Sequence, residues 1–117
     1  MSKARKFIGI LSMELADMQE DLAVLIDEAR RNRLEDACTE YVFKENSSLY
    51  ECEIIALRDI AGEIDARGLD SADSLASAVE SIMDFVPKLV HEKNYPAWTV
   101  DLVTRKVEKI KRFVEME

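Results

Sequence analysis

The chain has 117 residues, of which 48% are hydrophobic and 34% are charged, and its formal net charge is -8. This length fits one domain whose core needs neither disulfides nor metals. The composition is too apolar for a disordered chain, and three glycines and two prolines are too few turn residues for an all-β fold. The acidic surplus opposes a nucleic-acid footprint, and no apolar run is long enough to span a membrane. We therefore expect one helical domain over residues 1–117, with no nucleic-acid or membrane partner and no cofactor.

The first predicted helix covers about residues 3–31. Its apolar residues recur at spacings of three and four, the heptad pattern of a helix that packs lengthwise on others. The basic start and apolar run imitate a signal peptide, but Glu14 and Asp17 cut that run short, so we expect a cytoplasmic protein. The apolar seam, which we expect to face the core throughout, comprises Ile8, Leu11, Leu15, Met18, Leu22, Leu25 and Ala29.

The second predicted helix begins near Leu34 and ends at "IDARGL". Gly68 there is suited to the left-handed residue after a helix, and Leu69 to the apolar contact that follows it. The stretch 44–48, "KENSS", interrupts the apolar rhythm. Two interpretations stay open: one long helix kinked near 44–48, which we favour, or a new helix that starts with a capping box at Ser48.

The third predicted helix opens at Asp70 or Ser71 as N-cap and contains Pro87, near which we expect a kink. The fourth begins around "NYPAW", because proline is tolerated in a first helical turn. Their seams follow the same three-and-four spacing. The seam residues are Leu75, Val79, Ile82, Val86 and Leu89 in the third helix, and Val100, Val103, Val107, Ile110 and Val114 in the fourth.

Four amphipathic helices with short connections predict an all-α fold, an antiparallel up-and-down four-helix bundle. The first and fourth helices are neighbours in such a bundle. We therefore expect acidic residues on the flank of the first helix to face basic residues of the fourth, and we expect Gly9 and Gly62 to permit close packing. The facing charges are Glu14, Asp21 and Glu28 on one side, and Lys106 and Lys111 on the other.

Several apolar residues lie off the main seams, and aromatic residues gather at the "NYPAW" corner. Either they widen the core-facing stripes, or they form a second contact surface for another copy or another protein. Aromatic anchors are enriched at the centres of protein interfaces. The interface candidates are Ile10, Met13, Val24, Tyr95, Trp98, Leu102 and Phe113.

Carboxylates on the first two helices raise the possibility of a divalent-metal site, as in helical nucleotide hydrolases. Glu14, Asp17 and Asp21 share one side of the first helix, and Glu51 and Glu53 could complete the set from the second. A doubled acidic motif of the E-E-x-x-E type is absent. An acid-rich helix face in water is the commoner explanation, so we expect no metal site.

His91 is the only histidine, and helical spacing places it on the solvent side of the third helix. A small acidic bundle with an exposed histidine suggests phosphotransfer as an alternative, but "HEKNY" lacks the H-x-x-K-G motif of histidine phosphotransfer domains. A cationic side chain near the end of a helix also has a purely structural explanation, because it interacts favourably with the helix dipole. We therefore assign no catalytic residue.

The two cysteines, Cys38 and Cys52, show no metal-binding spacing. If both lie in one helix they are about 21 Å apart along its axis, too far for a disulfide. We expect both to be buried and reduced.

The function expected from the sequence is contact with proteins, as an adaptor, assembly factor or regulatory subunit, by self-association or with another protein. The alternative is an enzyme or phosphocarrier that uses the helix carboxylates with a divalent metal, or His91. A small-molecule ligand is neither predicted nor excluded.

Overall fold

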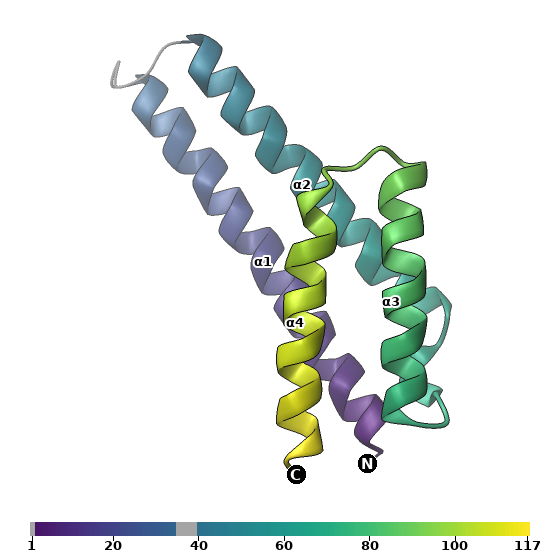
Figure 1. The fold of residues 1–117 in the computed structure, drawn as a ribbon. Coiled ribbons are helices and arrows are strands. Elements are labelled where there is room, and N and C mark those ends of the chain that lie inside the picture. The colour runs from purple at the N-terminus through teal and green to yellow at the C-terminus, as the bar shows by residue number, and fades with distance from the viewer. Residues whose placement is uncertain (1, 35–39) are drawn as a thin grey trace.

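The computed structural model describes residues 2–34 and 40–117. Within these residues it contains four compactly packed α-helices and no strand, so the all-α prediction is confirmed (Figure 1). The elements are α1 (Lys3–Leu34), α2 (Glu40–Ala66), a short 3₁₀ turn η1 (Leu69–Ser71), α3 (Leu75–Glu92) and α4 (Trp98–Glu115).

The two helix pairs differ in length. The helices α1 and α2 have 32 and 27 residues, whereas α3 and α4 have 18 residues each. Figure 1 shows successive helices running in alternating directions, with α1 and α2 continuing past α3 and α4 as a two-helix projection. We call this projection the arm and define it as residues 22–34 of α1 and 40–53 of α2. The molecule is correspondingly elongated, at 53 × 30 × 20 Å.

The apolar core lies where all four helices overlap. In α1 the fully buried part of the seam ends at Leu15, and Met18 and Leu22 are only partly buried. Leu25 is 39% exposed, so the prediction that the whole seam faces the core is wrong at this residue, because α3 and α4 do not extend over the arm. The core residues of the other helices include Leu57, Ile60, Ile64, Ile82, Phe85, Val86, Val103, Val107, Ile110 and Val114.

The end of α2 confirms the prediction at Gly68. This glycine has φ 62°, its N–H donates to the carbonyl of Asp65 at 3.1 Å, and Leu69 after it is buried. The helix is unbroken through residues 44–48, so the alternative of a new helix capped by Ser48 is wrong. The kink expected near 44–48 stays a prediction.

The predicted start of α3 is wrong by several residues. Instead of capping a helix, Asp70 and Ser71 belong to η1, and the N-cap is Ser74, whose hydroxyl accepts a hydrogen bond from the Ser77 N–H at 3.0 Å. Burial of Leu69 holds this segment against the core, so the chain forms a separate turn before the helix. The helix then continues through Pro87, and the kink expected there stays a prediction.

The connection from α3 to α4 contains a turn that the sequence analysis missed. Asn94, expected at the start of α4, instead ends α3 in the left-handed conformation with φ 55°. The Tyr95 N–H donates to the Val90 carbonyl at 3.0 Å, and the Asn94 N–H to the His91 carbonyl at 3.2 Å. These two bonds form a Schellman motif, and α4 begins only at Trp98.

The predicted charge pairing between α1 and α4 is confirmed for one pair. The ammonium of Lys106 lies 3.1 Å from a carboxylate oxygen of Glu14. Lys6 also pairs with Glu117, which fits the position of both chain ends at one end of the molecule (Figure 1). Lys111 pairs with Glu115 in its own helix.

Two smaller predictions are wrong. Cys52 is free and exposed rather than buried, because the buried side of α2 here is formed by Glu53, Ala56 and Leu57; Cys38 lies outside the described residues. A Cβ atom added to Gly9 or Gly62 would meet no atom within 4 Å, so neither glycine is needed for close packing. No helix of residues 2–34 and 40–117 is both long and apolar enough to cross a membrane.

Gly68 and Gly62 provide a matched pair of substitutions, because both have room for a Cβ atom but differ in backbone conformation. We expect Gly68→Ala to lower the free energy of unfolding by about 1–2 kcal/mol, the cost of a left-handed L-residue. Gly62→Ala should raise it by about 0.5–1 kcal/mol, because alanine favours a helix interior. Urea unfolding measures both, and changes of the same sign would contradict the assignment.

Candidate functional site

A buried polar contact joins the first turn of α4 to the middle of α2. The side chain of Glu53 is only 3% exposed, and Thr99 is fully buried. The Thr99 hydroxyl lies 3.1 Å from each carboxylate oxygen of Glu53. Ala97, the N-cap of α4, gives no side-chain cap, and the first turn of α4 is instead joined to Glu53 of α2 through Thr99.

Burial raises the pKa of Glu53 above its ordinary value of 4.5, while hydrogen bonds from Thr99 and Trp98 act in the opposite direction. A buried carboxyl that keeps a hydrogen-bond donor is held in place by that donor. Glu53 therefore fixes where α4 begins on α2.

A second polar contact holds the corner before α4. The Tyr95 hydroxyl donates to a carboxylate oxygen of Asp59 at 2.5 Å. This hydrogen bond, together with partial burial and the negative charge of Asp59, raises the pKa of Tyr95 to about 12. Asn94 makes the contact possible, because its left-handed turn directs the chain back toward α2. Two carboxylates of α2 thus hold the α3–α4 connection.

A small apolar cavity of about 190 Å³ lies beside this junction, between α1, α2 and α4. The side chain of Trp98, next to Thr99, is 49% exposed at the end of α4. The cavity marks the last level at which α4 covers the groove between α1 and α2. Its lining residues are Met18, Asp21, Leu22, Glu53, Leu57 and Leu102.

One helical turn further along the arm, the same groove is uncovered. Leu25 follows Leu22 on α1, and Leu49 precedes Glu53 on α2; they are 39% and 43% exposed. Met18, Leu22, Glu53 and Leu57 line one cavity. Because α1 and α2 run in opposite directions, Leu25 and Leu49 both lie beyond that cavity, toward the tip of the arm. We call the surface formed by Leu22, Leu25, Leu49 and Trp98 the arm face.

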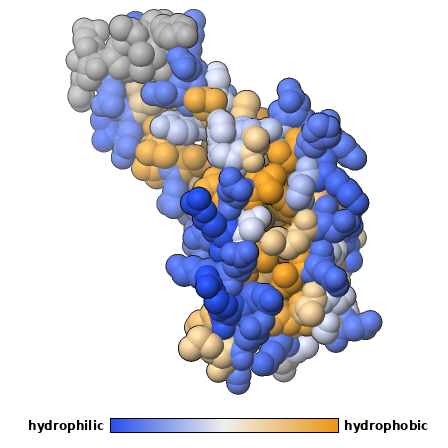
Figure 2. Space-filling model, in the orientation of Figure 1, coloured by the Kyte–Doolittle hydropathy of each residue, from blue (hydrophilic) through white to orange (hydrophobic). Residues whose placement is uncertain are grey.

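Acidic residues border the arm face. Helical spacing places Asp21 and Glu28 beside Leu25 on α1, and Glu45 beside Leu49 on α2. All three carboxylates are exposed. Figure 2 shows apolar residues on the visible face of the arm with hydrophilic residues at its edges. The arm face is therefore an apolar surface with an acidic rim.

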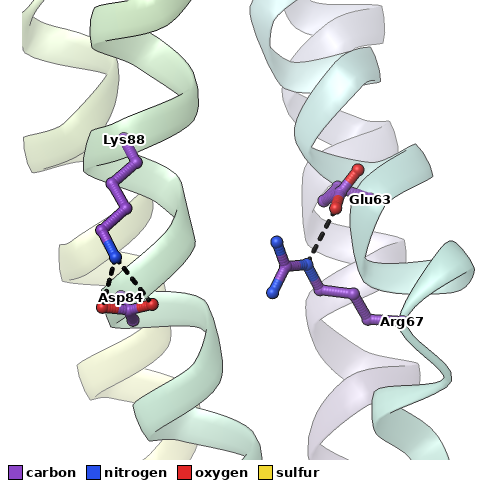
Figure 3. Close-up of polar contacts among 4 residues, drawn as sticks. All are labelled: Glu63, Arg67, Asp84 and Lys88. Carbon is purple, nitrogen blue, oxygen red and sulfur yellow. Dashed lines mark hydrogen bonds and ion pairs between the residues drawn. The ribbon is translucent and has the colours of Figure 1, made fainter.

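A groove between α2 and α3 is lined by two ion pairs and by a third carboxylate, Glu92. Glu63 and Arg67 form an ion pair at 2.8 Å, and Asp84 and Lys88 form another at 3.2 Å (Figure 3). The Arg67 guanidinium also lies 4.6 Å from the centre of the Phe85 ring. Because each cation pairs with a carboxylate one turn away, the groove of about 290 Å³ offers little attraction to an anionic ligand. The i,i+4 spacing of these charges was the available sequence signal.

His91 is exposed, as predicted, and lines a cavity of about 290 Å³ at the α3–α4 corner. The remaining lining residues carry no charged side chain. They are Pro87, Val90, Asn94, Tyr95, Ala97 and Val100. No acid or second base therefore lines this cavity beside His91 to orient it for proton transfer.

The five carboxylates considered for a metal site are not brought together. Glu14 pairs with Lys106, Asp17 and Glu51 are exposed, and only Asp21 and Glu53 line a common cavity. In the part of the chain that the structure describes, no three or more acidic, cysteine or histidine side chains are grouped to hold a metal ion.

The seven interface candidates divide into two groups. Ile10, Tyr95 and Leu102 are partly buried, so they widen the core-facing stripes. The exposed group comprises Met13, Val24, Trp98 and Phe113. Phe113 and Ile10 line a separate groove of about 250 Å³ between α1 and α4, far along α4 from Trp98.

Replacing the buried hydroxyl tests the α2–α4 junction. We expect Thr99→Val to lower the free energy of unfolding by about 1–3 kcal/mol, because the Glu53 carboxyl loses a donor in a buried site. Thr104→Val, at a half-buried position of the same helix, should change it by less than about 0.5 kcal/mol. Equal losses in urea unfolding would show that the Glu53 contact is not special.

The pH dependence of stability tests the burial of Glu53. Because the pKa in the folded protein lies above 4.5, the folded state binds more protons than the unfolded state just above that pH. The contribution of Glu53 to stability is therefore most favourable below pH 4.5 and falls as pH rises through the folded pKa. We expect wild type to lose stability relative to Glu53→Gln as the pH rises above 4.5 and through the folded pKa of Glu53. The exposed control Glu51→Gln should change the pH dependence less, and a flat difference for Glu53→Gln would contradict the assignment.

Comparison with known proteins assigns no family. No protein-family model, curated protein or solved structure matches this chain. Its function is therefore inferred from its own surfaces, among which the arm face combines exposed apolar side chains with exposed carboxylates at its rim.

Proposed function

We propose that this protein works through protein contacts, as an adaptor, assembly factor or regulatory subunit, and that the arm face is its contact surface. The observation that carries this proposal is that α4 begins at Trp98, whereas α1 and α2 continue beyond that level. The leucines beyond that level, Leu25 and Leu49, are 39% and 43% exposed.

The energy available from covering this surface is substantial. Full burial of a leucine side chain contributes about 1.5–3 kcal/mol relative to an exposed one, and part of this is still available at both Leu25 and Leu49. Trp98 adds a large half-exposed aromatic side chain, the type that most often dominates the energy of interfaces. A partner that covers all three residues gains affinity without disturbing the core.

We also propose the finer architecture and location that the sequence predicted. The four helices are inferred to form an antiparallel up-and-down bundle in which α1 and α2 are longer than α3 and α4. Their alternating directions in Figure 1 support this inference. The cytoplasm is the proposed compartment, supported by a thiol at Cys52 that is free and exposed, because such thiols are kept reduced there.

Self-association through the arm face is disfavoured by its rim. Two copies facing each other would bring Asp21, Glu28 and Glu45 of both chains together, and like charges across an interface repel. We expect sedimentation at micromolar concentration to show a monomer of 13.4 kDa. A dimer that Leu25→Gln dissociates would instead show that a second copy covers this face.

Affinity capture from cells that produce the protein tests the proposed function. We expect the variant Leu25→Gln/Leu49→Gln to lose proteins that wild type retains, because glutamine keeps the helix propensity but removes the apolar contact. The control Met13→Gln/Phe113→Gln alters two exposed apolar residues outside the arm and should retain the same proteins as wild type.

Circular dichroism of each variant should show unchanged helix content, since none of the four residues is fully buried. Identical captured proteins for wild type and the arm variant would exclude the arm face as the contact surface. Loss with the control pair instead would move the surface to the groove between α1 and α4.

A further inference from the structure

We infer that the partner of the arm face is a basic amphipathic helix of another protein, lying on α1 and α2 beyond the first turn of α4. This inference rests on the proposed function, in which the arm face is a contact surface, and it adds the chemistry of what binds there. It follows from the way that α4 packs on α1, with its first turns also against α2.

The helix α4 shows what kind of helix this groove accepts. Its buried seam, which includes Val103, Val107 and Ile110, faces the core. Beside the seam, Lys106 reaches the acidic flank of α1 and pairs with Glu14 at 3.1 Å. A helix with an apolar stripe and a basic flank thus already covers the N-terminal half of α1.

The acidic flank continues into the arm at the same spacing. Asp21 and Glu28 follow Glu14 at intervals of seven residues, so they lie on nearly the same side of α1, one and two heptads further on. Glu14 pairs with Lys106. The first turns of α4 lie near Asp21, and α4 does not cover α1 beyond that residue. The row of acidic residues on α1 therefore continues beyond the point where α4 supplies a basic partner.

The surrounding sequence leaves this part of the molecule strongly negative. Residues 7–29 of α1 contain six carboxylates and no lysine or arginine, and residues 45–57 of α2 contain three carboxylates and no lysine or arginine. The basic residues of the arm, Arg30, Arg31, Arg33 and Lys44, lie toward its tip. The acidic stretch next to α4 therefore attracts a partner of the opposite charge and speeds its association. An acidic helix or a second copy of this chain meets repulsion here instead.

The dimensions of the arm define the partner segment. The arm part of α1 is about 18 Å long, which corresponds to about 12 residues of helix. Such a helix needs apolar residues at i, i+3, i+4 and i+7 to meet Leu25 and Leu49. Two lysines or arginines seven residues apart would then face Asp21 and Glu28.

The single tryptophan allows a direct binding test with the full chain. Trp98 is the only tryptophan and is part of the arm face, so its fluorescence reports when the surface is covered. The probe is a designed peptide of about 14 residues with leucine at the apolar positions, lysine at the flanks and no aromatic residue. Its matched control has the same leucines with glutamate in place of lysine.

We expect the lysine peptide to shift the Trp98 emission to shorter wavelength with a saturable curve, and the glutamate peptide to give no shift. Added salt should weaken the binding, because the rim charges are exposed and screened. Equal binding of both peptides, or binding of the glutamate peptide alone, would overturn the inference.

Charge reversal gives a second, independent readout. The variant Asp21→Lys/Glu28→Lys should bind the lysine peptide roughly tenfold more weakly, since two attractions become repulsions, and should gain binding of the glutamate peptide. The control Asp65→Lys/Glu80→Lys changes the net charge equally at two exposed positions outside the arm. It should bind the lysine peptide as wild type does, apart from a small long-range effect that salt removes.

These experiments separate the inference from the proposed function. If the lysine peptide does not bind while Leu25→Gln/Leu49→Gln still loses captured proteins, the contact surface stands and its basic partner is wrong. If that variant captures the same proteins as wild type and the peptide does not bind, both are wrong. A lysine peptide that binds the charge-reversed variant as well as wild type also overturns the inference, because attraction by the acidic rim would then have no part in binding.

Discussion

The unequal length of the two helix pairs is the constraint on which the rest of this structure depends. A helix of 32 residues is about 48 Å long, whereas one of 18 residues is about 27 Å long. The shorter pair, α3 and α4, therefore covers only part of the longer pair. Where four helices overlap, the seam residues are buried or packed against the buried core. Where only α1 and α2 are present, Leu25 and Leu49 are exposed. A two-helix hairpin cannot bury both sides of its apolar stripe.

The position of the boundary between these regions is set by polar contacts rather than by the core. Glu53 and Asp59 on α2 hold Thr99 and Tyr95, at the first turn of α4 and at the corner before it. Apolar seams built on a seven-residue repeat can slide by a whole repeat with little change in contact, but a buried carboxyl and its donor must meet at one register. The same contacts place Trp98 where the covered groove ends. The junction of α2 and α4 thus both fixes the register of the helices and sets where the proposed contact surface begins.

Charge has a consistent direction along the groove. The basic helix α4 lies on the acidic flank of α1, and the pair of Lys106 with Glu14 is the visible result. Exposed pairs of this kind contribute little to stability, but they select which helix lies where. The uninterrupted acidic stretches of α1 and α2 extend that selection beyond the end of α4. The contact of α4 with α1 and the proposed contact of another protein with the arm face would then both pair basic residues with the acidic flank of α1. The two contacts would meet at the cavity lined by Leu22, Leu57 and Leu102.

The sequence by itself determined the features that depend on neighbouring residues: the four amphipathic helices, the left-handed glycine at Gly68, the exposure of His91 and the acidic flank that meets α4. It misplaced the start of α3, because capping by Ser74 depends on where the burial of Leu69 leaves the chain, and it missed the turn at Asn94, where a non-glycine residue is left-handed. Only the tertiary structure decided that Glu53 is buried, that Cys52 is exposed and that the seam at Leu25 is uncovered. The physical reason is distance along the chain: Glu53 and Thr99 are 46 residues apart, and whether a seam residue is buried depends on how far other helices reach over it, which no local pattern records.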